Sequence, residues 1–154
     1  MTELILRFIL RDFIFGVFGA LGFALIINVP RKSIIVSSVL GGFAYMVFDI
    51  IYYYATNLYF AVFAASVFIA VYSELLARKF KMPAIIFILP GIVALVPGVG
   101  LYNTILRLID NDFFGFLRQG AETIFVACAI ASAIAVVNIL IRAIFGRIKR
   151  AQRS

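Results

Sequence analysis

The chain has 154 residues, of which 65% are hydrophobic and 14% are charged. A soluble domain is about half apolar and about a quarter charged, so this composition indicates an integral membrane protein. The chain has one cysteine, Cys128, and no histidine, so it lacks the residues that most metal sites and nucleophile–base pairs use. We therefore expect no enzyme activity, no cofactor and no metal site. The net charge is +7, and the basic residues lie mainly at the ends of hydrophobic segments. This distribution is typical of membrane topology rather than of a nucleic-acid partner.

Five hydrophobic segments can be recognised along the chain. Their predicted boundaries are about 8–29, 33–55, 58–77, 84–109 and 123–145, followed by a basic tail at 146–154. Each segment is long enough to cross the hydrocarbon core of a bilayer, which is about 30 Å thick. The first segment lacks a small-x-small cleavage site and is interpreted as a retained helix. The sequence thus predicts an all-α, polytopic membrane helical bundle that forms one domain over residues 1–154.

The basic residues also predict the orientation of the chain. With five crossings, the loops after the first and third segments lie on the same side of the membrane as the C-terminal tail. Most of the Lys and Arg residues lie on that side. Because cytoplasmic loops are enriched in Lys and Arg, we expect a cytoplasmic C-terminus and an outside N-terminus in the cell inner membrane.

The fourth segment carries the same dipeptide twice, as Pro90-Gly91 and Pro97-Gly98. Proline removes a helix donor and glycine allows the chain to leave helical geometry, so we expect a break at each pair. Broken helices in transporters present free amides and carbonyls to small polar solutes. Gly100, Tyr102 and Asn103 follow the second pair directly and are candidate substrate-path residues. A kinked helix that only packs against its neighbours is the alternative.

Four further polar residues are candidates for function or structure. Asp49 lies inside the second segment, where a carboxylate is costly and often serves an ion or proton path. An acid that faces the interface or is hydrogen-bonded within the protein is the alternative. Glu74 precedes Arg78 by four residues, the spacing of a structural helical ion pair. Asn28 precedes Pro30, and it either contributes to the substrate path or caps the end of the first segment.

Small residues at four-residue spacing indicate faces that pack closely against other helices. The pairs and series are Ser37/Gly41, Ser38/Gly42, Ala61/Ala65 and Ala127/Ala131/Ala135. These faces favour a partner subunit, while packing within the chain alone remains the alternative.

Three motifs resemble the threonine/serine exporter (ThrE-type) family. They are GFALIINVP at 22–30, SELLAR at 73–78 and LPGIVALVPGVGLY at 89–102. The chain is most similar to the small, YjjB-like subunit that corresponds to the C-terminal half of the full-length exporter. Asp49 departs from this pattern, since it matches none of the family motifs.

The resemblance implies efflux of threonine and serine, or of dicarboxylates in split systems, by antiport with protons. It also implies a larger partner subunit that carries the other half of the architecture. Together the two subunits would cross the membrane about ten times. Proton coupling in this chain would most simply use Asp49. Two other functions stay open, namely a self-sufficient homo-oligomeric channel or transporter and a membrane scaffold subunit that transports nothing.

Overall fold

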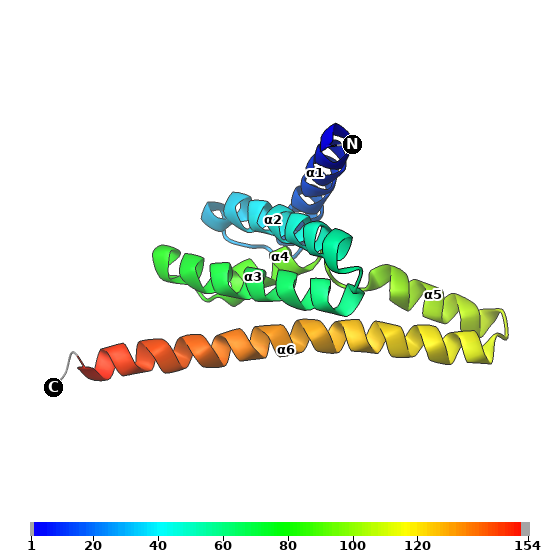
Figure 1. Ribbon diagram of the computed structural model, residues 1–154. Helices are drawn as coiled ribbons and strands as arrows, with labels where there is room; N and C mark the ends of the chain where they lie inside the picture. The colour runs from blue at the N-terminus through cyan, green and yellow to red at the C-terminus, as the bar shows by residue number, and fades with distance from the viewer. Residues whose placement is uncertain (1, 152–154) are drawn as a thin grey trace.

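The computed structural model describes the backbone of residues 2–151 and the side chains of residues 10–143. Within this part the chain is all-helical and has no strand (Figure 1). The helices are α1 (Thr2–Ile26), α2 (Arg31–Ala55), α3 (Leu58–Phe80), α4 (Ile85–Ile92), α5 (Gly98–Ile109) and α6 (Phe113–Ala151). The expected all-α architecture is therefore confirmed.

Helices α1 and α2 contact each other at glycine and alanine residues. A Cβ atom on Gly41 would lie 2.6 Å from Ala20 Cβ, and one on Gly16 would lie 3.0 Å from Gly42 Cα. Such close approach requires small side chains, because lipid provides no hydrophobic force that drives helices together. The small pairs predicted on α2 thus lie inside the bundle.

Helix α4 forms the centre of the bundle, between α2 and α3 (Figure 1). Phe87, Pro90 and Gly91 of α4 are buried, and Ile69 of α3 contacts the position of a Gly91 side chain at 3.4 Å. Helix α6 packs along α3, and its N-terminal part packs along α5 in a hairpin that extends beyond the turn between α2 and α3 (Figure 1).

Three helices are long and apolar enough to cross a membrane within the part of the chain that was described. They are Arg31–Ala55, Leu58–Phe80 and Phe113–Ala143 of α6. Helix α4 has 8 residues and α5 has 12, which corresponds to lengths of about 12 Å and about 18 Å. Neither can cross the bilayer alone, but the two together match its thickness.

The fourth and fifth predicted segments differ from the structure. The run 84–109 contains two helices with one interruption, at 93–97, and Pro90 lies inside α4. Helix α6 begins at Phe113 rather than near residue 123, because Asp112 caps it. Residues 113–122, which lie between the fourth and fifth predicted segments, are the first part of α6. The basic tail at 146–154 lies outside the described side chains, and α6 continues to Ala151.

The cap of α6 predicts a pH-dependent stability of the α5–α6 hairpin. Asp112 Oδ1 accepts a hydrogen bond from the Gly115 N–H at 2.9 Å, and Arg107 Nη1 donates to Oδ2 at 2.8 Å. These two contacts, the backbone bond first, lower the pKa of Asp112. Since the folded pKa lies below the unfolded one, the stabilisation is present above an unfolded pKa of about 3.9 and is lost as pH falls through the folded pKa.

We therefore expect Asp112→Asn to lower the melting temperature in detergent at pH 7, and the difference from the unmodified chain to shrink below about pH 4. Asp110→Asn is the matched control, since Asp110 lies in the same loop and caps no helix N-terminus; it should not lower the melting temperature. A difference that stays constant with pH would show that the carboxylate charge has no part in the cap.

Candidate functional site

The interruption between α4 and α5 is a tight turn at Pro97. Pro97 has φ −75° and ψ 56°, and the Gly98 N–H donates to Val96 O at 2.7 Å, which is the geometry of an inverse γ-turn. In a continuous helix the Val93 carbonyl would accept from residue 97, but proline has no N–H. The turn therefore frees backbone carbonyls at the end of α4.

The N-terminus of α5 carries free donors. The first helical hydrogen bond of α5 runs from the Leu101 N–H to Pro97 O, at 3.0 Å. Pro97 provides no side-chain cap. The N–H groups of Val99 and Gly100 precede this first helical bond and therefore point out of the helix end. Helix N-termini of this kind favour anionic groups.

A cavity of about 320 Å³, named here the break cavity, lies beside this turn. Its apolar wall comes from α2, α3 and the turn, and its polar groups come mainly from α5 and α6. The lining residues are Tyr45, Phe48, Leu58, Val62, Ala94, Leu95, Pro97, Val99, Gly100, Asn103, Gln119, Glu122, Thr123 and Val126. The volume is at the lower end of the range for ligand sites, about 300–1,000 Å³, and fits a small solute.

The predicted substrate-path residues divide into two groups. Pro97, Gly100 and Asn103 line the break cavity. Pro90 and Gly91 are instead buried in α4, and Tyr102 is exposed on α5. The remaining members, Gly98 and Asn28, also lie outside the cavity lining.

Asn28 ends α1. It has a positive φ of 54°, the Val29 N–H donates to Ala24 O at 3.0 Å, and the Asn28 N–H donates to Leu25 O at 3.2 Å. This pair of bonds is a Schellman motif, in which asparagine is one of the few residues that tolerate the left-handed conformation. The capping interpretation thus explains Asn28 without a solute.

The ion pair between Glu74 and Arg78 is long. Arg78 Nη2 lies 3.9 Å from Glu74 Oε2, one helical turn apart on α3. Pairs of this kind on partly exposed helix surfaces contribute little to stability. Glu74 is therefore a useful control position for tests of the other carboxylates.

Gly100 allows α5 to approach α6 closely at the cavity. A Cβ atom on Gly100 would lie 2.7 Å from Thr123 Oγ1, and that hydroxyl group donates to Gln119 O at 2.7 Å. Any side chain at position 100 would therefore push Thr123 or separate the two helices. Glycine at this position sets the width of the hairpin.

We expect Gly100→Ala to destabilise the protein by about 1–3 kcal/mol through overpacking, measured by thermal unfolding in detergent. Gly98→Ala is the matched control, because its Cβ would meet nothing within 4 Å, and it should stabilise by up to about 1 kcal/mol. Adding Thr123→Ala to Gly100→Ala removes the clashing hydroxyl group and should recover part of the loss. Equal effects of the two single substitutions would contradict the close approach.

Asp49 faces a second carboxylate, Asp12 of α1, with Arg11 beside them. Asp49 Oδ2 is buried and accepts no hydrogen bond within the described part of the chain. The α1–α2 interface therefore brings two carboxylates close together.

Tyr45 connects this pair to the break cavity. Asp12 and Tyr45 line a groove of about 430 Å³ that Val93 and Ala94 of the turn also line. Tyr45 and Ala94 belong to the break cavity as well, so the groove and the cavity meet at these two residues. Of the two carboxylates, Asp12 is the one that lines the groove.

Sequence reasoning missed Asp12, Tyr45 and the residues of α6 that line the cavity, namely Gln119, Glu122 and Thr123. Gln119 and Glu122 lie between the fourth and fifth predicted segments and Thr123 begins the fifth, although the three residues have helical spacing for one face. Asp12 lies within the first predicted segment and was not among the candidate residues. Its position inside an apolar helix was the available signal.

Comparison with known proteins supports a transport protein. Searches of the curated proteins and of the solved structures find no match. The family model described as threonine/serine exporter, ThrE, matches residues 12–140. This match covers the α1–α2 carboxylate pair, the turn at Pro97 and the α6 wall of the break cavity. The chain therefore belongs to the threonine/serine exporter (ThrE) family.

Proposed function

We propose that this chain is one subunit of a secondary transporter that exports threonine and serine in exchange for protons. The observation that carries the proposal is the interruption at Pro97, where free backbone groups border a cavity of about 320 Å³. Half-helix ends at such breaks are a recurrent way to bind small polar solutes in membrane transporters. Membership of the exporter family provides the substrate class.

The solute carboxylate would bind at the N–H groups of Val99 and Gly100, at the positive end of the α5 dipole. The freed carbonyls at the end of α4 would accept from the amino group. Asn103, which lines the same cavity, would add a side-chain hydrogen bond. These contacts are complementary to a zwitterion at both of its charged ends.

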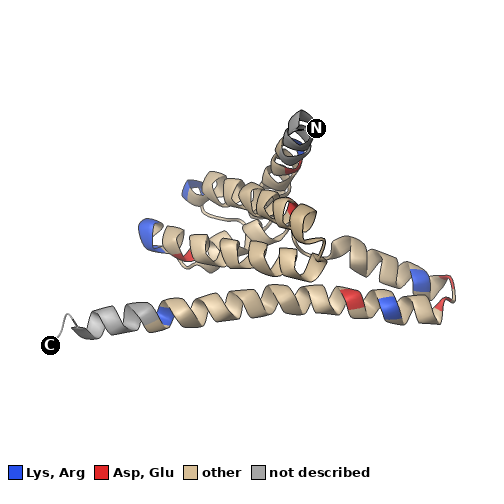
Figure 2. Cartoon of the chain, viewed as in Figure 1, with Lys and Arg blue, Asp and Glu red and all other residues tan. Residues whose placement is uncertain are grey.

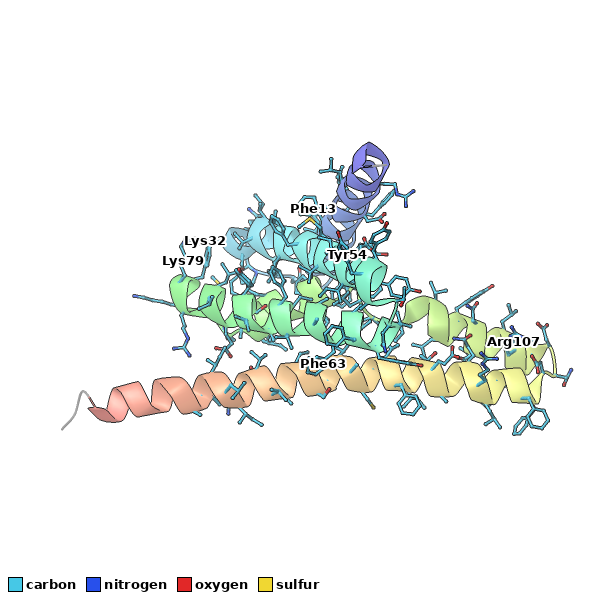
Figure 3. The ribbon with its side chains drawn as sticks, in the orientation of Figure 1. Phe13, Lys32, Tyr54, Phe63, Lys79 and Arg107 are labelled. Carbon is cyan, nitrogen blue, oxygen red and sulfur yellow. The ribbon has the colours of Figure 1, made fainter. Side chains whose placement is uncertain are left out.

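The chain would cross the inner membrane five times, with α4 and α5 together as the fourth crossing. The basic residues at the start of α2 and the end of α3 lie at the same end of the bundle (Figure 2), as the labelled Lys32 and Lys79 show (Figure 3). The α5–α6 hairpin with Arg107 lies at the opposite end (Figure 3). The positive-inside rule would then place the C-terminus in the cytoplasm and the N-terminus outside.

Proton coupling would use Asp49 together with Asp12. The pair would release its proton to one side and regain it from the other as the α1–α2 interface changes its exposure. Tyr45, which lines both the groove beside Asp12 and the break cavity, would connect protonation to solute binding. An ionisable residue at membrane depth commonly has such a role.

A larger subunit would cover the outer face of α6. The series Ala127, Ala131 and Ala135 is exposed on that helix, in contrast to the small residues of α2, which pack inside the bundle. Small residues at this spacing permit close approach of another helix. In this proposal, the subunit with the other half of the exporter, which the family resemblance implies, would bind there.

The test is efflux of preloaded labelled threonine, serine and succinate from cells that lack their own exporters. The chain would be expressed alone and with a larger subunit of the same family. Efflux that requires both chains and a proton gradient supports the proposal. Efflux from the chain alone supports a homo-oligomeric transporter, and no efflux from two membrane-inserted chains contradicts the proposal.

A further inference from the structure

We propose that Glu122 selects solutes that carry a positively charged amino group and rejects dicarboxylates. This inference rests on the proposed function, since it assigns a specificity-determining residue to the same cavity. Sequence reasoning left threonine, serine and dicarboxylates open as substrates. The charge on the α6 wall distinguishes between these classes.

Glu122 is the charged side chain among the described residues that line the break cavity. Its wall, on α6, lies beside the N-terminus of α5, because a Cβ atom on Gly100 would lie 2.7 Å from the Oγ1 atom of Thr123, the residue next to Glu122. The other polar side chains of the lining, such as Asn103, Gln119 and Thr123, are neutral. The cavity thus has one acidic side chain, Glu122, and backbone donors at Val99 and Gly100.

The carboxylate of Glu122 remains available to a solute. Its ion pair with Arg118 is long, with Arg118 Nε 3.4 Å from Glu122 Oε1, and the Arg118 side chain is 85% exposed. Arg118 lines a neighbouring space together with Arg107, and Glu122 lines both that space and the break cavity. Exposed pairs of this kind are weak, so an ammonium group in the cavity can compete for the carboxylate.

A carboxylate and a set of amide donors that line the same cavity match a zwitterion. The solute carboxylate binds at the donors of α5 and its ammonium group binds Glu122. A dicarboxylate in the same place would bring its second carboxylate against Glu122, and like charges at close range are unfavourable. The arrangement therefore favours threonine and serine over succinate.

The experiment measures binding of labelled L-threonine to the full-length chain in lipid nanodiscs, alone and in complex with the larger subunit. Competitors are threoninol, which keeps the ammonium group, N-acetylthreonine, which lacks it, and succinate. The variants are Glu122→Gln, Glu122→Asp and the exchange Gln119→Glu with Glu122→Gln. Arg118→Gln is the matched control. Monodispersity and melting temperature establish that each variant is folded.

We expect Glu122→Gln to weaken threonine binding about tenfold or more, the loss of one charge-assisted hydrogen bond, and to leave succinate binding unchanged or stronger. Threoninol should lose its ability to compete, whereas N-acetylthreonine should not. Glu122→Asp and the Gln119–Glu122 exchange should recover part of the preference for threonine. Arg118→Gln should retain it.

An unchanged preference for threonine over succinate in folded Glu122→Gln overturns the role of Glu122 and leaves the exporter proposal intact. Equal weakening of threonine and succinate also overturns it, because a packing role would affect both. If the unmodified chain and the complex bind no threonine and export none, the proposed function fails together with the inference.

Discussion

Asp49→Asn is expected to reduce proton-driven threonine efflux on the order of a hundredfold, the lower end of what loss of a positioned proton-transfer group costs. Asparagine keeps the shape of the side chain and can donate to Asp12, so the α1–α2 interface should remain folded. Exchange of internal for external threonine requires no net proton movement and should largely persist. The measurement compares net efflux under a pH gradient with exchange at equal pH in proteoliposomes.

Glu74→Gln is the matched control for Asp49→Asn, since Glu74 is also a helical acid but has Arg78 as its ion-pair partner. It should change net efflux by less than about twofold, as expected for a weak pair. Asp12→Asn should resemble Asp49→Asn, because either substitution removes one member of the pair. If net efflux and exchange fall together in Asp49→Asn, Asp49 acts in folding or solute binding and not in proton coupling.

The helices with clear local end signals could be predicted from the sequence. The turn at Thr56 and Asn57 is one example, because Asn57 Oδ1 caps α3 by accepting from the Phe60 N–H at 3.1 Å. Thr56 adopts a positive φ of 50° at the end of α2. Both features depend on residues adjacent in sequence, and short-range polar chemistry of this kind can be recognised without the fold.

The two Pro-Gly pairs could not be distinguished by the same reasoning. Pro90 lies two residues before the end of α4, and it costs that helix one hydrogen bond, to residue 86. Burial of α4 on several sides compensates for this loss, and burial is a tertiary property. Pro97 follows the buried part, so the chain turns there. Local chemistry predicted a break, but the packing of α4 determined its position.

The break cavity and the carboxylate pair were beyond local patterns because each joins distant parts of the chain. Asp12 meets Asp49 only because α1 and α2 cross at Gly16 and Gly42. Glu122 reaches the cavity only because α6 begins at Phe113 and Gly100 brings α5 against Thr123. Helical periodicity predicts on which face of a helix a residue lies, but it does not predict which other helix packs against that face.

The repeated dipeptide provides an internal comparison for the role of the break. Replacing Pro97 and Gly98 together by alanine restores the N–H at position 97 and favours a continuous helix by about 4 kcal/mol, from the helix propensities of proline and glycine relative to alanine. Such a helix would replace the turn with straight helix, and the first N–H groups of α5 would then form helical hydrogen bonds. We expect threonine efflux to fall about tenfold or more while the protein remains folded.

The matched control replaces Pro90 and Gly91 by alanine. These residues already lie within α4, and a Cβ at position 91 would contact Ile69 at an ordinary 3.4 Å, so the change should stabilise α4 and leave most of the efflux. Spin labels at Leu89 and Ile105, both exposed, in a Cys128→Ser background would report whether the turn has straightened. Equal efflux from the two double variants, with a longer label distance only in the first, would show that the break does not carry the solute. Loss of efflux only where the distance increases would identify the turn at Pro97 as the part of α4–α5 on which transport depends.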